Sequence, residues 1–535
     1  MASIVIISPR EKNPPLETTS FRIRMALHGV IAVGSALEAR GHRVRIFCEL
    51  SGARVDWEIV RRADYVCFSF LSFCAKRAYA MADRVRQECK LPVIMGGSHP
   101  SVMPEDCLNH CDYVVRNEGE QALAELIEAL ENGNDPTPIK GLTFRDAQGR
   151  LIHNEDQPMN ADFSRPLNLD LIPEYGTRGF WWNLKDALDN GMPRVPMPVV
   201  QASRGCPENC KFCVVKYQLG SRYRKRPIEV VLNEIEQYGK RFQTPYFMFV
   251  DNDMSVDPQF TKTLLLTILE RYGTSLRPYV FSRIDIYKND ELLRILEQFD
   301  HATLGVGVES LSDDSLRDLN KRQSREDIFT AIAALRRYKI SVNGLFMFGT
   351  EYDTPETIRQ TVDYCIESGF FSVGLFAIYD FPGRESLLGQ PQMIADHLFI
   401  HRDWRYYNLS FAVNYPRLMR PSQLQAGIFE GYKRFNDRSP DSMYQFMPTR
   451  RTAMKYLEYL RRVERPFYDA HDRRLEEKVA GRTLADMDAE VPIRVSQAEI
   501  YLETANFLAR NLIRPISWKL LRGMMFSALT AKRQP

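Results

Sequence analysis

Three cysteines lie within eight residues of one another, in the stretch SRGCPENCKFC. Cys206, Cys210 and Cys213 follow the spacing C-x3-C-x2-C in a polar loop, with a glycine before the first thiol and a proline after it. Thiolates at this spacing can wrap one metal centre, whereas structural cysteines are ordinarily buried in apolar surroundings. The stretch is therefore the first place in the chain where the residue types indicate chemistry.

The number of thiols bears on which metal centre this stretch can hold. Structural zinc usually takes four ligands as two separated pairs, and the sequence has no second C-x-x-C. Cys111 or Cys365 could fold in as a fourth ligand, but neither has a partner at metal-ligand spacing. A 4Fe–4S cluster also usually takes four thiolates, so three leave one iron open for a substrate or cofactor. The stretch therefore predicts a cluster with an open iron.

A series of alternating apolar runs and helical stretches begins just before the cysteines. Six β/α units predict a partial (β/α)6 barrel, whose active-site residues gather at the carboxyl ends of its strands. The cysteines follow the first strand, so they lie at the expected mouth. The expected strands are 198–203, 246–251, 279–285, 302–310, 341–349 and 372–380, and the expected helices are 227–240, 257–271, 289–298, 324–337 and 354–367.

An earlier series predicts a doubly wound, Rossmann-like parallel sheet, with ligands at the loops that follow its strands. The predicted class is therefore α/β, with four parts: a Rossmann-like domain at 1–135, a linker with a hairpin at 136–195, the barrel at 196–395 and a mainly helical region at 396–535. The expected strands of the first domain are 3–8, 44–49, 64–70, 92–97 and 112–116, and its helices are 25–40, 75–90 and 119–132.

Composition limits the partners and the compartment. A formal net charge of +3 over 535 residues gives no reason to expect nucleic acid. The N-terminus lacks the pattern of a secretion signal, and no stretch of about 18 apolar residues spans a membrane. Seven cysteines are scattered through the chain, several in apolar runs, as is typical of reduced thiols. We expect a cytoplasmic protein.

The last thirty residues leave a second location open. After Glu503 the chain has no acidic residue, and basic residues alternate with apolar ones such as Trp518 and Phe526. A basic amphipathic helix can lie in an anionic membrane surface, which would favour an apolar or lipid-like substrate. The alternative is that this segment packs on the barrel and leaves its charges in water.

The cysteine motif, with Phe212 directly before the last thiol and a strand before the first, resembles the radical S-adenosylmethionine (SAM) superfamily. The resemblance implies that Cys206, Cys210 and Cys213 hold a 4Fe–4S cluster whose open iron chelates SAM. It also implies that an electron donor of flavodoxin or ferredoxin type reduces the cluster, which then cleaves SAM to a 5′-deoxyadenosyl radical. The missing fourth ligand would then be the cofactor.

Further barrel positions are similar to those that the family uses for SAM, as is Phe212. Glu309 and Ser310, in GVES, end a strand where similar enzymes place a carboxylate against the ribose or amine. Lys321 resembles a residue that neutralises the cofactor carboxylate. Tyr379 precedes a segment resembling the adenine-side loop, although Arg384 stands where the family usually has threonine. The alternatives are a solvated strand-end glutamate and a solvated helix-end lysine.

Four more charged residues are expected at strand ends that face the same mouth. Asp251 and Asp253 lie in FVDND, and Arg283 and Asp285 lie in SRID. Their side chains could bind a substrate or cap neighbouring helices, and the sequence leaves both readings open.

The N-terminal series resembles the cobalamin-binding domain fused to many radical SAM enzymes. Gly96 and Gly97 would let the backbone approach a large flat ligand, and Glu118 and Gly119 open a helix whose N-terminus could receive a polar group. The loop after the first strand has no histidine, so we expect none on cobalt. The remaining candidates for contact with cobalamin are residues of the loop after the third strand, which would face the lower side of the cobalt: Ser72, Phe73 and Cys74. His99 would lie beside the nucleotide tail of cobalamin or is simply a loop histidine. The alternative is a domain that has lost cobalamin.

Three functions remain open on this reading. The first is a cobalamin-dependent methyltransferase that acts on an unactivated carbon of a small molecule. The second is radical cyclisation, coupling or rearrangement, with cobalamin absent or used for electron transfer. The third is an iron–sulfur electron carrier or sensor without substrate chemistry.

Overall fold

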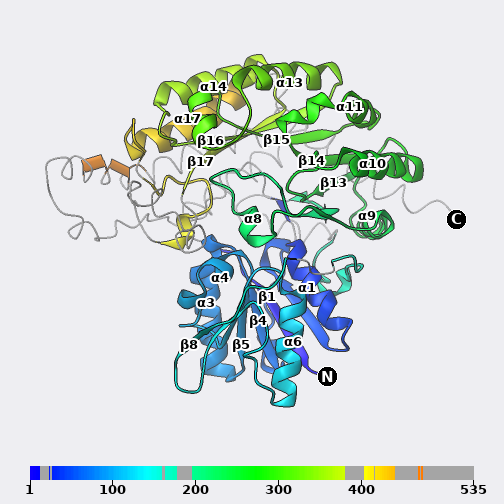
Figure 1. Cartoon of the computed structure of the whole chain (residues 1–535), viewed down its shortest axis with the longest axis vertical. Helices are drawn as coiled ribbons and strands as arrows, with labels where there is room; N and C mark the ends of the chain where they lie inside the picture. The colour runs from blue at the N-terminus through cyan, green and yellow to red at the C-terminus, as the bar shows by residue number, and fades with distance from the viewer. Residues whose placement is uncertain are drawn as a thin grey trace, which may run out of the picture.

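The structure is a computed structural model in which two parallel sheets, each with helices around it, lie one beside the other (Figure 1). The described residues are 1–11, 27–159, 163–176, 197–379, 403–414 and 416–439, with the backbone of 23–24 and 195–196 and the single residues or pairs 465, 468–469 and 472–473. The segments FWWN at 180–183, 380–402 and the basic tail lie outside the described residues.

The N-terminal sheet has seven strands in the order β3-β1-β4-β5-β6-β7-β8. The first five are parallel, whereas β7 and β8 form an antiparallel hairpin that pairs with β6. The expected hairpin therefore extends this sheet. The strands are β1 (Ser3–Ser8), β3 (Arg43–Cys48), β4 (Tyr65–Ser69), β5 (Val93–Gly96), β6 (Tyr113–Val115), β7 (Leu142–Arg145) and β8 (Leu151–His153).

The strand order reverses beside β1, since β3 lies on one side of it and β4 on the other. In doubly wound sheets such a switch point opens a crevice at the carboxyl ends of the strands. The helices around this sheet are α1 (His28–Glu38), α2 (Trp57–Arg61), α3 (Ala75–Arg84), α4 (Ser98–Val102), α5 (Pro104–Cys107) and α6 (Gly119–Asn132). Two short 3₁₀ turns, η1 (Glu49–Ser51) and η2 (Ser72–Cys74), lie between them, and the π-helical η3 (Val85–Cys89) continues α3.

The second sheet has six parallel strands in chain order, which is the partial barrel expected from the sequence. Its strands are β10 (Val199–Val200), β13 (Tyr246–Phe249), β14 (Arg277–Arg283), β15 (Thr303–Glu309), β16 (Ser341–Phe348) and β17 (Ser372–Ala377). Its helices are α9 (Ile228–Phe242), α10 (Pro258–Tyr272), α11 (Asp290–Glu297), α12 (Asp313–Asp318), α13 (Arg325–Arg337) and α14 (Pro355–Glu367), with the turn η5 (Ile284–Lys288). The α/β class is confirmed.

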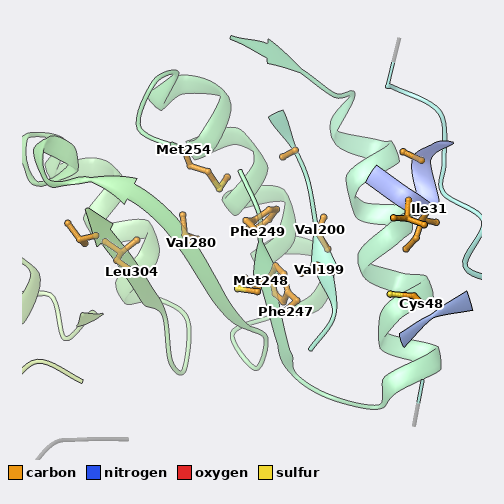
Figure 2. Packing of buried hydrophobic residues seen from close by; sticks show 14 of the residues in the cluster. Ile31, Cys48, Val199, Val200, Phe247, Met248, Phe249, Met254, Val280 and Leu304 are labelled. Atoms are coloured by element: carbon orange, nitrogen blue, oxygen red, sulfur yellow. The ribbon is translucent and has the colours of Figure 1, made fainter. Parts of the chain in front are cut away.

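One hydrophobic core runs through both sheets. It includes Ile31 of α1 and Cys48 of β3 together with Val199, Phe249 and Leu304 of the barrel. Figure 2 shows Ile31 and Cys48 on one side of a barrel helix and the barrel residues on its other side. The barrel and the N-terminal sheet therefore pack against each other through apolar side chains as well as polar ones.

The described part of the C-terminal region is helical at α17 (Pro421–Arg438), which packs on α14 and β17. The Tyr432 hydroxyl accepts a hydrogen bond from the backbone nitrogen of Leu375 at 2.8 Å. Phe411 and Val413 are buried in the core. Among the described residues, no helix has both the length and the apolar character needed to cross a bilayer.

Candidate functional site

The cysteine motif lies in a loop that is closed at its base by two short strands. β11 (Ser203–Arg204) pairs antiparallel with β12 (Arg224–Lys225), and the helix α8 (Val215–Gln218) lies in the loop between them. Gly205 starts the loop at a φ of 87°, and a Cβ there would overlap the carbonyl oxygen of Arg222. Only glycine fits this turn without strain. The glycine therefore allows the stem to close directly beneath the first thiol.

The three thiols are partly exposed and interact electrostatically with one another. Burial raises the pKa of all three, that of Cys206 to about 11. The cationic side chains of Lys321 and Arg283 act against this shift at Cys210, and Lys321 also acts on Cys213. Nearby positive charge favours the thiolate, which is the form that binds metals. The loop thus has the donors and the charge that an iron–sulfur cluster requires.

The fourth-ligand alternative finds no support in the positions of the other cysteines. Cys111 is buried in the core of the N-terminal sheet, and Cys365 is buried in α14 within the larger core. Among the described residues, which include all ten cysteines, no three Cys, His, Asp or Glu side chains converge on a point that could hold a single metal ion. A compact zinc site is therefore not formed by the described residues.

Asp251 follows β13 and binds the start of the cysteine loop. Its carboxylate accepts a hydrogen bond from the backbone nitrogen of Ala202 at 3.0 Å and a short one from the Ser203 hydroxyl. It is fully buried, and desolvation raises its pKa to about 6 despite these hydrogen bonds. A buried carboxylate with two donors from one strand holds that strand in place. In this structure Asp251 positions the stem of the loop.

Asp253 binds neighbouring strand ends in the same way. It accepts hydrogen bonds from the nitrogen and hydroxyl of Ser255 at 2.9 and 2.6 Å and from the nitrogen of Arg283 at 3.3 Å. Burial raises its pKa, and its charge acts on Cys206. These contacts hold loop and strand ends and cap no helix, and substrate binding by the two aspartates stays a prediction.

Glu309 and Lys321 form a buried ion pair beside the thiols. Lys321 Nζ lies 2.6 Å from Glu309 Oε1, and the two side chains are 6% and 8% exposed. Burial alone would lower the pKa of Lys321, but the Glu309 charge raises it above the ordinary value. A Cβ on Gly307 would lie 2.6 Å from Glu309 Oε1 and 2.7 Å from Lys321 Nζ. The glycine therefore leaves the space that this pair fills, and neither residue is solvated.

Glu309 also departs from regular strand geometry. Its φ is 63°, and the register between β15 and β16 shifts between Gly307 and Glu309. A left-handed non-glycine residue at a bulge costs free energy and is typical of functional sites. The bulge turns the carboxylate toward Lys321. The strand end is therefore shaped to hold this side chain.

Arg283 connects several of these groups. It donates to the carbonyl of Lys321 at 3.1 Å, and ion pairs of 3.4 and 3.5 Å join it to Glu208 of the cysteine loop and to Asp285. Arg283 Nη1, the atom that forms the ion pair with Glu208, and Asp285 Oδ1 are buried, and neither has a hydrogen bond among the described residues. Buried polar atoms without a hydrogen bond are rare and often face a ligand or a water molecule. These two atoms are suited to a polar ligand.

The other residues predicted to contact SAM lie in different settings. Phe212 is half-buried, with its ring 5.9 Å from Lys321 Nζ. The Ser310 hydroxyl accepts a hydrogen bond from the backbone nitrogen of Ser312, the residue that caps α12. Tyr379 is half-buried against Tyr407, and its hydroxyl donates to the Tyr407 carbonyl at 3.4 Å. Their roles in binding SAM remain predictions.

A cavity of about 270 Å³ lies at the carboxyl ends of the N-terminal strands, at the switch point beside β1. Its walls come from β1, β4, β5 and β6, from the starts of α1 and α6, and from the cysteine loop. Four predicted cobalamin residues line it: Gly96, Gly97, Glu118 and Gly119. Gln218 of the cysteine loop also lines it, and its Nε2 is buried without a partner among the described residues. The cavity therefore offers an unsatisfied donor to a ligand.

The two glycines of this cavity also serve the packing beneath it. Gly97 has a φ of 97°, and a Cβ there would lie 2.9 Å from the backbone nitrogen of Phe70. A Cβ on Gly96 would lie 3.3 Å from the Val115 carbonyl. From the sequence we expect these glycines to give a flat ligand access to the backbone. The structure shows a second reason for them, since neighbouring strand ends pack too closely for a side chain at these positions.

The loop after β4, which contains Ser72, Phe73 and Cys74, does not line the cavity, and neither does His99. His99 is fully buried and contacts the Ser72 hydroxyl at 3.1 Å and the Tyr79 hydroxyl at 2.9 Å. Burial lowers its pKa, so the ring is neutral. Ser72 and Cys74 are buried, and Phe73 is half-buried in η2, which packs against η6 (Trp404–Tyr406). The predicted contacts of these residues with cobalamin stay predictions.

Sequence reasoning did not identify Arg204 and Arg224 as site residues. They are cross-strand neighbours at the stem of the cysteine loop, and Arg224 makes a bidentate pair with Glu118 at 2.6 and 2.8 Å. Arg204 pairs with Glu120 at 2.7 Å. The sequence signal was available, since RNEGE lies at a strand end and two arginines flank the motif, but nothing in the sequence indicated that they meet.

Comparison with known proteins identifies both parts of the chain. Residues 200–365 match the family model of the radical SAM superfamily, and residues 27–127 match that of the B12 binding domain. The chain is a radical SAM enzyme that carries a B12 binding domain before its radical SAM domain. Its cofactors are a 4Fe–4S cluster, SAM and cobalamin. The resemblance drawn from the cysteine motif is confirmed, and the electron-carrier alternative is set aside.

Several named proteins are similar in sequence to large parts of the chain. An uncharacterized methyltransferase of Pyrococcus horikoshii is 26% identical over 59% of this chain and 66% of its own length. Bacteriochlorophyllide d C-12(1)-methyltransferase of Chlorobaculum tepidum is 23% identical over 64% of this chain and 68% of its own length. An anaerobic magnesium-protoporphyrin IX monomethyl ester cyclase of Rubrivivax gelatinosus is 22% identical over 74% and 70%. The chain thus spans about two thirds of the length of these relatives.

A solved structure shares the arrangement of the whole chain. The cobalamin-dependent SAM radical enzyme OxsB, with aqua-cobalamin and SAM bound, has a TM-score of 0.62 with 14% sequence identity. The match covers 98% of this chain and 81% of that one. At this identity the likeness shows the fold, with a B12-type domain packed on a radical SAM barrel.

The residues present fit these cofactors. Three thiols beside two cations suit an iron–sulfur cluster. The buried Arg283 Nη1 and Asp285 Oδ1, which make no hydrogen bond among the described residues, suit the polar ends of SAM. The cavity, where Gln218 Nε2 makes no hydrogen bond among the described residues, lies where a B12 ligand would meet the cysteine loop. Both sites are therefore compatible with the matched families.

Proposed function

We propose that this protein is a cobalamin-dependent radical SAM methyltransferase that acts on an unactivated carbon of a small molecule. The observation that carries the proposal is the cavity at the switch point of the B12-type domain, which is lined on its other side by the cysteine loop. A donor of methyl groups and a generator of radicals would then share one wall. Two of the three relatives are named as methyltransferases, which supports the same reading.

When bound, the cluster and SAM supply a 5′-deoxyadenosyl radical, and cobalamin supplies a methyl group. Within the proposal, Cys206, Cys210 and Cys213 hold the cluster, and Arg283 with the Glu309–Lys321 pair binds the polar end of SAM. Asp251 and Asp253 hold the loop and strand ends in position through hydrogen bonds. Gly96, Gly97 and Gly119 line the cobalamin cavity.

We also propose the partners and the setting that the sequence indicated. A small one-electron donor of flavodoxin or ferredoxin type reduces the cluster, and the substrate is apolar or lipid-like. All ten cysteines are free in the structure, which supports a reducing cytoplasm. The basic C-terminal tail makes a peripheral contact with anionic membrane.

We further propose that the chain divides into a cobalamin-binding domain at 1–135, a linker, a radical SAM barrel at 196–395 and a mainly helical region at 396–535.

A second candidate is radical cyclisation, favoured by the similarity to the magnesium-protoporphyrin cyclase. The two functions differ in how SAM is consumed. A methyltransferase of this kind uses SAM both as the radical source and as the methyl source, so it yields 5′-deoxyadenosine and S-adenosylhomocysteine. A cyclase uses SAM only as the radical source.

The test uses the full chain, reconstituted anaerobically with iron, sulfide and hydroxocobalamin and supplied with a low-potential reductant and SAM. We expect chromatography to detect both 5′-deoxyadenosine and S-adenosylhomocysteine. Omission of cobalamin should abolish S-adenosylhomocysteine and leave 5′-deoxyadenosine. If 5′-deoxyadenosine forms without S-adenosylhomocysteine in the cobalamin-loaded protein, the methyltransferase proposal is wrong and the cyclase reading is favoured.

A further inference from the structure

The stem of the cysteine loop carries two arginines side by side. Arg204 of β11 is directly opposite Arg224 of β12, and their side chains are 4% and 10% exposed. Like charges at opposite positions of a two-stranded ribbon repel each other, and burial increases the cost. The stem is therefore not stable as a ribbon on its own. It requires negative charge from elsewhere in the molecule.

That negative charge comes from the B12-type domain. Glu118 accepts two hydrogen bonds from Arg224, at 2.6 and 2.8 Å, and one from Arg204 at 3.3 Å. Glu120 pairs with Arg204 at 2.7 Å. Two carboxylates of one domain thus neutralise two guanidinium groups of the other.

Both carboxylates lie at the start of one helix. They belong to the turn between β6 and α6, where Glu118 is the last residue before the helix and Glu120 is in its first turn. The same turn lines the cavity, as do Arg204 and the cysteine-loop residues Gln218 and Leu219. The ion-pair cluster is therefore continuous with the wall that a ligand in the cavity would touch.

The other side of the stem is anchored to the barrel. Arg226, fully buried, pairs with Glu234 of α9 and donates to the Gln201 carbonyl at 2.9 Å. One face of the stem is thus fixed to the barrel and the other to the B12-type domain. The position of the thiols relative to the cavity depends on both anchors.

We propose that Glu118 and Glu120 are positioning residues: they clamp the stem of the cysteine loop to the B12-type domain and so fix where the cluster stands relative to the bound cobalamin. The inference rests on the assignment of the three thiols to the cluster, but it requires no particular reaction. It extends the role expected for Glu118, which was a contact with cobalamin.

The test compares the full-length protein with the Glu118→Gln/Glu120→Gln double variant, each loaded with hydroxocobalamin and a reconstituted cluster. With cobalamin as cob(II)alamin and the cluster reduced, both groups are paramagnetic, so electron paramagnetic resonance reports the magnetic interaction between them. We expect one well-defined interaction in the native protein and its loss or broadening in the variant. Iron and cobalamin contents are measured on the same samples, so that only loaded molecules are compared.

Two controls separate positioning from general destabilisation. Glu174→Gln removes a half-buried ion pair with Arg45, away from the stem, and should leave the interaction unchanged. Glu120→Gln alone removes one of the contacts, and it replaces the double variant in the test if the double variant does not fold. It should broaden the magnetic interaction between the cluster and cobalamin. A merely structural role would lower the cofactor contents but leave the interaction native in the loaded fraction.

An unchanged interaction in a loaded Glu118→Gln/Glu120→Gln protein, or in Glu120→Gln where it is the variant used, would overturn the inference. A native protein without any cluster signal would overturn the assignment of the thiols and the inference with it. Failure to form S-adenosylhomocysteine would contradict the proposed function alone, because the magnetic interaction does not depend on methyl transfer.

Discussion

The buried pair of Glu309 and Lys321 gives a prediction whose size follows from the structure. Lys321→Met leaves the Glu309 carboxylate buried at 8% exposure without its partner, and Glu309→Gln leaves the Lys321 ammonium at 6% exposure. Removing one member of a buried pair typically costs about 3–5 kcal/mol. We expect each single variant of the metal-free protein to lose stability of this order.

The double variant Glu309→Gln/Lys321→Met removes both charges. It should recover most of the loss, because no uncompensated charge remains buried, so the two effects should fail to add by about 2 kcal/mol or more. Gly307→Ala is an independent perturbation that keeps both charges. Its Cβ would lie within 2.7 Å of both charged groups, so it should destabilise the native protein and affect the double variant less.

The assay is equilibrium urea unfolding of the metal-free chain under reducing conditions, with SAM binding measured by calorimetry on the reconstituted protein. Both single variants should also weaken SAM binding if the pair faces the cofactor. Additive losses in the double variant would contradict the reasoning, because they would mean that the two side chains do not interact. If the stability losses are non-additive but the affinity for SAM does not change, the pair stabilises the fold only, and its role in SAM binding is refuted.

Three further predictions concern other residues. Burial raises the pKa of Asp251 from 3.8 to about 6, so the folded state binds the proton more tightly than the unfolded state. As the pH falls from 7 to 4, the native metal-free protein should therefore gain roughly 2 kcal/mol of stability relative to Asp251→Asn, and equal pH dependence in urea unfolding would contradict this. Gly205→Ala should lose most of its iron on desalting, whereas Gly239→Ala, in α9 with open space around its Cβ, should retain it. In cob(II)alamin protein, electron paramagnetic resonance should show no nitrogen splitting from histidine, and His99→Gln should not change the spectrum; native splitting that His99→Gln removes would refute this.

Both sheets were predictable because parallel strands covered on two faces have near-continuous apolar sequences. β1 (SIVIIS) and β16 (SVNGLFMF) are examples, and the expected strand limits lie within a few residues of the observed ones. The two-residue strands β11 and β12 were not predicted, because so short a ribbon has no hydrophobic period. Its stability comes from ion pairs with residues far away in the sequence.

The residues of the candidate site were predictable where a sequence motif identifies them. They were less predictable where a residue's role depends on which other residues it contacts in the fold. The thiols were identified by spacing alone. Glu309 and Lys321 were each weighed against solvated alternatives, and the structure shows them buried together, since only the fold brings two residues twelve positions apart into one pair. Asp251 reads the same in sequence whether it binds a ligand or Ser203, because strand-end carboxylates serve both purposes.

The most direct test of the central claim is the iron and sulfide content of the reconstituted chain. The native protein should bind about four irons per chain and show the broad visible absorption of a 4Fe–4S cluster. Replacement of Cys206, Cys210 and Cys213 together by alanine should abolish both signals, whereas Cys111→Ala and Cys365→Ala, each the loss of a buried thiol outside the loop, should keep them. Retention of about four irons in the triple variant would contradict the assignment.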